Sequence, residues 1–564
     1  MNHYRGFPAR RDTPLTLFLV CSLYCLLVIA FGMKAVSLGV DEVQYIARGW
    51  LIITGGFELG SENLHYPPGW YWALGFWQKF FGRELQIIRL LPMILGLGTI
   101  LMTYFLCRDL VGSKAGVLGT ILLAINPLFI NLHSNSKTQP LVLLLFSAVL
   151  WLSVSGREMR WPVQAFLIAF GISLMLLVRG HMIVSLPVFL ILIWWFRDRY
   201  SVVTPLVVIA VVALITGLVF SMLPDRTVLD IVRDLNVEYY LTKLGMVDLS
   251  PIESLRPGES WLSANSLMRR LPAQKTYFAD LWYYKWLVVE LFRHPLALTF
   301  LVSPIVAALG GLFLIFKKPK TKPEVGALFA VIGYFYLAAG HFLAGLFAGG
   351  VSLILPLSMY FHTAQIPIIA MLFLKIRDLR GSFHSDWLTI SLAIFWFALI
   401  APGFLTISEN QGALGRAQKQ LAELTDQFRE YKKQDKEILY LGFNRAPLLA
   451  LSLAGVDVNQ KSFMPRYVKL VDDQRFTSDP DLYQETERRG WWSNAHLSKW
   501  IGETYDTVLI STSAYERHVN QNIKGYGKVF PQWAFDEVRE KFSCDPLELS
   551  QQESLLWCKR RGAG

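Results

Sequence analysis

The chain has 564 residues, of which 53% are hydrophobic and 17% are charged, and its formal net charge is +11. Soluble proteins carry about 25% charged residues, so this composition excludes disordered, collagen-like and coiled-coil chains and argues against a soluble enzyme. Apolar runs of about 20 residues recur, and each is long enough to cross a hydrocarbon core of about 30 Å. We therefore expect an α-helical polytopic membrane protein.

About eleven membrane spans are predicted along the chain. They cover roughly 14–36, 86–106, 115–131, 140–154, 162–178, 181–196, 202–223, 296–316, 325–347, 353–374 and 387–407. The third to sixth spans are short for a full crossing, so tilted, kinked or partly re-entrant helices are expected there.

The distribution of charge predicts how these spans are oriented. With the N-terminus inside, the short inside segments hold 16 Lys or Arg against 7 Asp or Glu, whereas the short outside connections hold only Lys137 and Arg179. This positive-inside pattern predicts an integral membrane protein, placed in a bacterial inner membrane, with its N-terminus inside and its C-terminus outside. Because the excess of positive charge lies on the inside segments, the basic balance does not indicate a nucleic-acid partner.

Two domains follow from this topology. Residues 1–407 form the transmembrane domain, with long outer loops at 37–85 and 224–295, and residues 408–564 form an extracytoplasmic domain. The latter segment is large enough to bury a core of its own.

The C-terminal segment is predicted to be an α/β domain. Residues 437–443 and 506–512 have the pattern of buried strands, and a helical pattern follows each of them. Between Leu414 and Tyr431, apolar residues recur at helical spacing. That helix packs on its own domain or pairs with a second copy as a coiled coil.

Asp41 and Glu42 lie a few residues after the first span, at the start of a helical run. Acidic residues are stabilised in the first turn of a helix by its dipole, which is one explanation for the pair. The other is catalytic, because a partly buried carboxylate at a water–lipid boundary has a raised pKa and can act as a base.

The stretch "HYPPGWYW" at 65–72 predicts a rigid turn followed by an aromatic return to the membrane. One explanation is that this stretch is simply a turn at the membrane interface. Alternatively, His65, with Tyr66 beside it, contributes a proton donor or base near neutral pH.

Basic groups are expected to gather at the same outer face. Arg89 lies near the start of the second span, Lys137 in the connection after the third span, and Arg179 after the fifth. His133 and His181 stand near the last two. These side chains either reach to the interface from apolar segments or bind a lipid-linked phosphate, for which Arg and Lys are suited.

Residues 41 to about 152 resemble the GT-C membrane glycosyltransferases, in particular the protein O-mannosyltransferase and lipid A aminoarabinose transferase group. The resemblance rests on "DEVQYIARGWLIITGG", "YPPGWYWALGFWQKFFG", "IIRLLPMILG", "CRDLVGSKAG" and "INPLFINLHSNSKTQP", in that order. Each piece is a weak signal, and their order and spacing together are specific.

The resemblance implies a catalytic role for Asp41, with Glu42 beside it, and a polyprenyl-phosphate sugar as the donor. Only Arg89 among the three cations stands at a position of the family pattern. The chain departs from the pattern at Gln139, where many relatives have an acid, and at Tyr66-Pro67-Pro68 in the first-loop turn. Because of these departures, the resemblance does not decide whether lipid A is the substrate or whether a divalent metal is bound.

The predicted function is therefore that of an inverting glycosyltransferase acting at the outer face of the membrane. It moves a sugar from a polyprenyl phosphate to a hydroxyl group of a lipid, glycan or protein. The alternatives are a lipid or glycan transporter, a non-catalytic assembly or scaffold protein, and an enzyme of the O-antigen polymerase or ligase type. The sequence has neither a GxxxxGK[ST] phosphate loop nor a GxSxG motif, which disfavours a nucleotide-driven pump and a serine hydrolase of that type.

Of the five cysteines, Cys544 and Cys558 lie in the segment that is predicted to be outside. In an oxidising compartment they are expected to form a disulfide, and the alternative is two free thiols. The five cysteines show no CxxC or Cys/His spacing typical of a metal site.

Overall fold

The computed structural model describes the N-terminal part of the chain most fully. The described residues are 13–33, 40–54, 67–155, 159–197, 202–221, 366, 369–370, 421–429, 438–441, 446–456, 466–467, 491–492, 494–511, 532–547 and 555–562. The predicted outer loop at 224–295 and, except for residues 366, 369 and 370, the last four predicted spans lie outside these residues.

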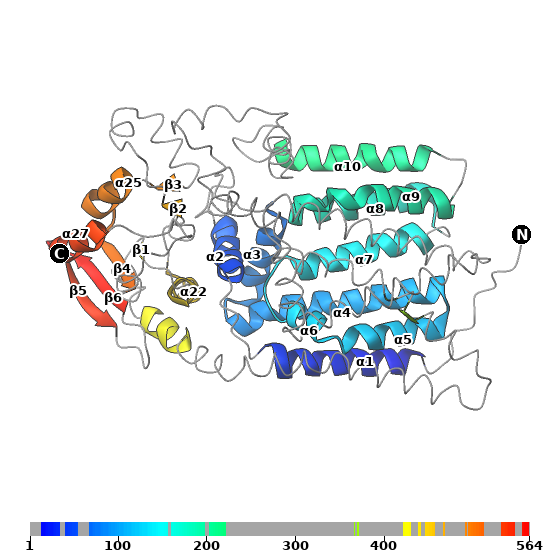
Figure 1. The fold of residues 1–564 in the computed structure, drawn as a ribbon, viewed down its shortest axis with the longest axis horizontal. Helices are drawn as coiled ribbons and strands as arrows, with labels where there is room; N and C mark the ends of the chain where they lie inside the picture. The colour runs from blue at the N-terminus through cyan, green and yellow to red at the C-terminus, as the bar shows by residue number, and fades with distance from the viewer. Residues whose placement is uncertain are drawn as a thin grey trace, which may run out of the picture.

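Apolar helices form a bundle in the described N-terminal part of the chain (Figure 1). They are α1 (Thr13–Leu27), α4 (Leu85–Leu110), α5 (Ser113–Ala124), α7 (Gln139–Ser155), α8 (Trp161–Val178), α9 (Leu186–Arg197) and α10 (Val203–Ser221). Helix α4 packs on α5 and α7, and α8 packs on α7 and α10. This order places each helix beside neighbours that are close in the sequence, as short connections require.

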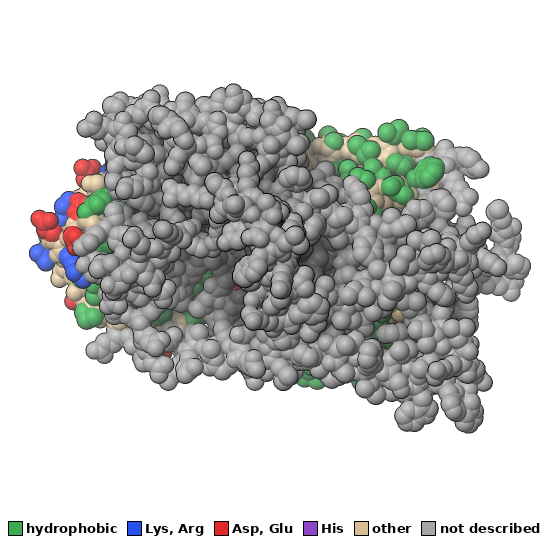
Figure 2. Space-filling model, in the orientation of Figure 1, with side chains coloured by type: hydrophobic (Ala, Val, Ile, Leu, Met, Phe, Trp, Pro, Cys, Tyr) green, Lys and Arg blue, Asp and Glu red, His purple; other side chains and the backbone are tan. Residues whose placement is uncertain are grey.

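Two of these helices, α4 and α8, are long and apolar enough to cross a membrane. Shorter apolar helices lie at Pro14–Ala30, Ser113–Ala124, Gln139–Val154 and Val203–Val219. Large apolar side chains are exposed along α8, α9 and α10, and Figure 2 shows them gathered on the surface at that end of the molecule. An exposed apolar surface of this kind matches a lipid environment better than water.

The third predicted span, 115–131, is not one continuous helix. It is divided into α5 and α6 (Pro127–His133), and the Asn126 side-chain oxygen accepts a hydrogen bond from the Phe129 backbone N–H at 3.3 Å. An Asn before a Pro at the first helical position is a strong helix start, which explains the break. Similarly, the sixth span begins as the 3-10 helix η3 (Gly180–Ser185) before α9, and α1 continues into the π-helix η1 (Val28–Gly32).

Helices α2 (Val40–Thr54) and α3 (Gly69–Phe81) lie at one end of the bundle and pack tightly on each other (Figure 1). A Cβ atom added at Gly75 would overlap the Gly49 carbonyl oxygen, so the two backbones are in direct contact. The Gln78 side-chain amide donates to the Ile46 carbonyl at 2.9 Å. The position of α2, and with it that of Asp41, therefore depends on α3.

Gly75→Ala should separate α2 from α3, because the added methyl group meets the backbone of Gly49, which cannot move aside as a side chain can, as well as the side chain of Ile53. We expect a loss of about 1–3 kcal/mol in stability, as for other overpacked sites, measured as a lower midpoint of thermal denaturation in detergent. Gly217→Ala in α10 is the matched control, since a Cβ there has no neighbour within 4 Å. Equal midpoints for the two variants would contradict the close α2–α3 contact.

The C-terminal part of the chain contains a mixed sheet with the strand order β1-β4-β6-β5. The strands are β1 (Ile438–Leu441), β4 (Thr507–Ser511), β5 (Phe542–Leu547) and β6 (Leu555–Arg560); β1 and β4 are parallel, and β6 is antiparallel to β4 and β5. The other elements are α22 (Ala446–Ala454), β2 (Arg466–Tyr467), β3 (Trp491–Trp492), α25 (Asn494–Lys499), the π-helix η7 (Trp500–Thr504) and α27 (Gln532–Lys541). Both buried strands predicted from the sequence are present as β1 and β4.

The helix at 421–429 packs against the sheet. Leu421, Leu424 and Phe428 are buried, and the ring of Phe428 lies 5.9 Å from that of Trp557 in β6. Of the two explanations for the apolar stripe, packing on its own domain is therefore the one that the structure shows for these residues.

Arg83, in the short connection between α3 and α4, joins the bundle to the C-terminal sheet module. Its guanidinium donates to the backbone oxygen and to the hydroxyl of Ser452 in α22, the latter at 3.2 Å, and it lies 4.3 Å from the centre of the Trp50 ring. Helix α22 also contacts α2 directly. The sheet module therefore lies at the end of the bundle that carries α2 and α3 (Figure 1).

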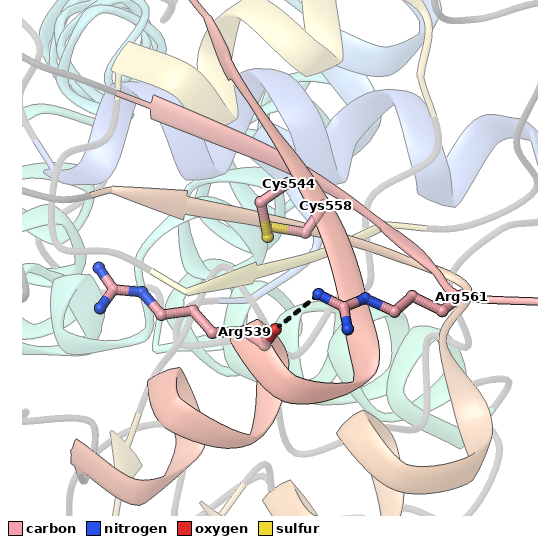
Figure 3. The surroundings of a disulfide bond; sticks show 4 residues. All are labelled: Arg539, Cys544, Cys558 and Arg561. Atoms are coloured by element: carbon pink, nitrogen blue, oxygen red, sulfur yellow. Dashed lines mark hydrogen bonds between the residues drawn. A yellow bond between two sulfur atoms is a disulfide. The ribbon is translucent and has the colours of Figure 1, made fainter.

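Cys544 and Cys558 form a disulfide, the pairing expected from the sequence. They are directly opposite each other in β5 and β6, and Figure 3 shows the bond beside the Arg561 side chain, which donates to the Arg539 carbonyl at 3.4 Å. The bond closes a hairpin with a sequence separation of 14.

Replacing both cysteines with Ala should lower the stability of the sheet module by roughly 3 kcal/mol, because the disulfide restricts the unfolded chain. Thermal denaturation with and without a reducing agent measures this effect. Reductant should lower the midpoint of the wild type and leave the double variant unchanged. Peptide mapping that finds both cysteines alkylated in the native, unreduced protein would contradict the disulfide.

Candidate functional site

The candidate site begins at the N-terminal turn of α2. Asp41 and Glu42 are the second and third residues of this helix, where the positive end of the helix dipole favours acidic side chains. Nothing is described of the Asp41 side chain. Glu42 is buried, with 1% of its surface exposed, so its charge requires partners within the protein.

Arg89 of α4 is the main partner of Glu42. Its Nε donates to Glu42 Oε1 at 3.0 Å and its Nη2 donates to Oε2 at 2.9 Å, which makes a bidentate ion pair. Both side chains are only 1% exposed. The backbone N–H of Ser136 donates to the same Oε1 at 3.0 Å. Paired in this way, the two buried charges hold α2, α4 and the α6–α7 connection together.

The α6–α7 connection, which we define as Ser134–Gln139, contacts several other segments of the site. Both backbone groups of Ser136 are hydrogen-bonded. Its N–H donates to Glu42, and its carbonyl accepts a hydrogen bond from Trp70 Nε1 of α3 at 3.2 Å. Thr138 Oγ1 accepts from Arg179 Nε at 2.7 Å. The structure therefore brings together segments around residues 42, 70, 89, 136 and 179, which are far apart in the sequence.

Lys137 lies at the middle of this connection and is partly exposed. Among the described residues, no carboxylate or carbonyl pairs with its ammonium group. Arg179 is 8% exposed and ends helix α8. Lys137 therefore precedes the residue to which Arg179 is hydrogen-bonded, and both side chains carry a positive charge that suits an anionic group.

Several polar atoms of the same connection are buried without a hydrogen-bond partner in the described part of the chain. They are Asn135 Oδ1, Ser136 Oγ and Gln139 Oε1. All three side chains are at most 6% exposed. Because buried polar groups are almost always hydrogen-bonded, these three atoms require a water molecule or a ligand as a partner.

His133, at the end of α6, is buried and lies beside Tyr24 and Phe129. Its Nδ1 is 2.8 Å from the Phe129 carbonyl oxygen, which can only accept, so Nδ1 carries a proton. This geometry fixes His133 within the helix packing rather than toward the Lys137–Arg179 region.

The sequence analysis did not select Arg48, which the structure places on α2 with 0% exposure. Burial lowers the pKa of its guanidinium, and the nearby phenols of Tyr71 and Tyr45 oppose this shift. Tyr45 and Arg48 are three residues apart and share one face of α2, a spacing that could have indicated the cluster.

Other predicted site residues cannot be placed in this arrangement. His65 and Tyr66 lie outside the described residues, and nothing is described of the His181 side chain.

For a divalent metal, the described residues contain no group of three His, Cys, Asp or Glu side chains that could hold one. Glu42, the buried carboxylate of this site, already has both oxygens engaged.

Comparisons with known proteins agree with the sequence resemblance. Residues 65–222 match the family model described as dolichyl-phosphate-mannose-protein mannosyltransferase. No curated protein matches the sequence.

Solved structures are similar over nearly the whole chain. The structure of ArnT from Cupriavidus metallidurans bound to undecaprenyl phosphate is 13% identical, with 96% of this chain and 97% of that chain covered and a TM-score of 0.53. The archaeal oligosaccharyltransferase AglB from Archaeoglobus fulgidus, in complex with an inhibitory peptide and a dolichol-phosphate, is 12% identical, with 99% and 75% covered and a TM-score of 0.52. These likenesses show that the chain shares the fold of these two enzymes, and the family-model match lies within the part of the chain on which the resemblance rests.

Proposed function

We propose that this chain is a membrane glycosyltransferase of the GT-C type and that it moves a sugar from a polyprenyl phosphate to an acceptor hydroxyl at the outer face of the membrane. The family-model match over residues 65–222 and the fold shared with ArnT and AglB support this proposal. The donor type, the acceptor and the residue roles below are our proposal. ArnT and AglB support it, since the structures of these proteins contain undecaprenyl phosphate and dolichol-phosphate.

The observation that supports the proposal is that segments carrying charged residues are hydrogen-bonded to one another at one end of the bundle. The N-terminal turn of α2, which contains Asp41, is linked through Glu42 to Ser136, and the same connection is linked through Thr138 to Arg179. A carboxylate and two cations are thereby placed on neighbouring segments. Such a set suits a reaction in which a proton leaves one oxygen while a phosphate gains charge.

In the proposed reaction, the acceptor hydroxyl attacks the anomeric carbon of the sugar from the side opposite the phosphate. The new C–O bond forms as the bond between that carbon and the phosphate oxygen breaks, so the configuration inverts. The hydroxyl proton passes to the Asp41 carboxylate, and the bonding electrons stay on the polyprenyl phosphate. Lys137 and Arg179 stabilise the negative charge that develops there.

Glu42 and Arg89 receive positioning roles in this proposal. The sequence analysis predicted Glu42 beside the catalytic centre and Arg89 as a phosphate ligand, and neither prediction has been tested. Because each side chain is engaged with the other, we propose that the pair holds the first turn of α2 in place and that Lys137 and Arg179 bind the phosphate. The disulfide agrees with an outside location of the sheet module, since disulfides persist in oxidising compartments.

Mass spectrometry of lipid-linked sugars and surface glycans, in cells with and without the gene, tests the function. Loss of the gene should cause a polyprenyl-phosphate sugar to accumulate and one glycan modification to disappear. Restoring the wild-type gene should reverse both changes. Unchanged pools of lipid-linked sugars and glycans would overturn the proposal.

Lys137→Ala and Arg179→Ala should each weaken the binding of polyprenyl phosphate by about 1.5–3 kcal/mol, the value of a hydrogen bond to a charged group. Binding of undecaprenyl phosphate to the purified variants measures this directly. Lys114→Ala, which removes an exposed cation at the start of α5, is the control and should bind normally. Unchanged affinity in both site variants would remove the phosphate assignment.

A further inference from the structure

Arg83, in the connection between α3 and α4, contacts both α2 and α22 through one guanidinium group. Its Nη2 donates to the Ser452 backbone oxygen and, at 3.2 Å, to the Ser452 hydroxyl. The same group lies over the Trp50 ring, 4.3 Å from its centre. Ser452 and Trp50 lie near the C-terminal ends of α22 and α2, so Arg83 joins these two helix ends to a third element.

The Ser452 carbonyl is a rigid acceptor, because α22 ends in a regular C-terminal cap. The Gly455 N–H donates to the Ser452 oxygen at 3.1 Å, and the Val456 N–H donates to the Leu451 oxygen at 3.0 Å. Gly455 has a φ of 79°, the left-handed conformation that this cap requires. The last carbonyls of a helix also carry the negative end of its dipole, which favours a guanidinium. The hydrogen bond from Arg83 therefore meets an oriented oxygen with a partial negative charge.

One face of the C-terminal sheet is continuous with the packing around α2. Tyr440, Leu509 and Trp557 belong to one hydrophobic cluster with buried side chains of α22 and α2. The opposite face belongs to a separate cluster with Leu497 of α25 and Phe535 of α27. Helix α22 packs directly on α2. A displacement of the sheet module would therefore be transmitted to α2, because close-packed interiors are hardly compressible.

Helix α2 is held at two places along its length. The Glu42–Arg89 ion pair fixes its first turn, and the Arg83 contact fixes it at Trp50, nine residues after Asp41. Nine residues of α-helix span about 14 Å, so a tilt of about 4° centred on Trp50 would move Asp41 by about 1 Å. A misplacement of this size at a reacting group can lower the rate by about 10²-fold.

We propose that Arg83 is a positioning residue. By binding the end of α22 and the Trp50 ring together, it locks the sheet module onto α2 and fixes where the first turn of α2 places Asp41. The role of Asp41 rests on the proposed function, whereas the lock between Arg83, Trp50 and Ser452 does not. A planar guanidinium stacks on a ring and donates along its edge at the same time, which the ammonium group of Lys does not do. The proposal therefore requires Arg, rather than any cation, at position 83.

Hydrogen–deuterium exchange of the purified full-length protein in nanodiscs tests the lock without any ligand. Arg83→Met retains an unbranched side chain and removes the guanidinium. It should raise amide exchange in α2 and α22 by about 10-fold or more, the smallest effect expected for the loss of a hydrogen bond to a charged group. Exchange in α8 should not change, and Arg83→Lys should give the same increase as Arg83→Met.

The effect on the reaction is measured in cells that lack the gene and are complemented with each variant at equal protein levels. The initial rate at which the missing glycan modification reappears should fall by about 10- to 10²-fold for both Arg83→Met and Arg83→Lys. Binding of undecaprenyl phosphate to the purified variants should not change, because Arg83 is not among the proposed phosphate ligands. A loss of rate without a loss of binding distinguishes positioning from a general loss of structure.

Two further variants make the test specific. Arg429→Met removes an exposed arginine of the same module whose ion-pair partner, Asp426, is on its own helix, so it should leave exchange in α2 and the rate of modification unchanged. Trp50→Leu removes the ring on the α2 side of the lock and should raise exchange in the same two helices as Arg83→Met. In the double variant Arg83→Met/Trp50→Leu, the increase should be smaller than the product of the two single effects, because both substitutions break one contact.

Each outcome decides a different statement. Unchanged exchange in α2 and α22 of Arg83→Met, or wild-type behaviour of Arg83→Lys, overturns the lock while the proposed function stands. Raised exchange with an unchanged rate of modification, or a parallel loss of undecaprenyl phosphate binding, overturns the positioning role. If the wild-type gene itself restores no modification, the proposed function and the role of Asp41 fail, and the exchange measurements still decide whether the lock exists.

Discussion

Asp41→Asn is expected to lower turnover by at least about 10²-fold, the lower end of the contribution of a general base. The amide has nearly the shape of the carboxylate but does not accept the proton of the acceptor hydroxyl. The effect should appear in kcat, measured with purified protein and the donor that accumulates in cells lacking the gene. Binding of undecaprenyl phosphate should be retained, because Asp41 is not among the proposed phosphate ligands.

Glu84→Gln is the matched control for this substitution. Glu84 precedes α4 at the same end of the bundle and is exposed, so the change removes one acidic charge near the site without touching the proposed base. It should leave turnover within a factor of about two, as for most surface substitutions. Wild-type turnover in purified Asp41→Asn would show that Asp41 is not the base.

Glu42→Ala is expected to lower stability by about 3–5 kcal/mol, because it leaves the Arg89 guanidinium buried without its carboxylate. It also removes the acceptor of the Ser136 N–H, so the α6–α7 connection loses its attachment to α2. Thermal denaturation and limited proteolysis of the detergent-solubilised protein measure the loss. Activity should fall with it, since the first turn of α2 carries Asp41.

The double variant Glu42→Ala/Arg89→Met separates the charge effect from simple loss of packing. Replacing a buried ion pair with apolar groups is often neutral, so the second substitution should recover much of the stability lost in Glu42→Ala. Activity should not recover to the same extent, because the attachment of Ser136 to Glu42 is still missing. A double variant less stable than Glu42→Ala would indicate that Arg89 is held by other contacts.

Local patterns explain what could be predicted about the fold. Apolar runs predicted helices at the positions of α1, α4, α5 and α7 to α10, and the buried strand patterns predicted β1 and β4, because run length and periodicity depend only on nearby residues. The apolar stripe of the 421–429 helix predicted its buried face but left its partner open. The partner is Trp557 in β6, a contact across more than a hundred residues that no local pattern encodes.

For the candidate site, the sequence by itself determined which charged residues stand at the ends of apolar segments, since such residues interrupt long hydrophobic runs. It did not determine how they pair. The Glu42–Arg89 ion pair joins residues 47 apart, and the bond from Ser136 to Glu42 joins residues 94 apart. Only the packing of α2, α4 and the α6–α7 connection decides these partners, because the favourable pairing of a buried charge depends on which groups the folded chain brings within hydrogen-bond distance.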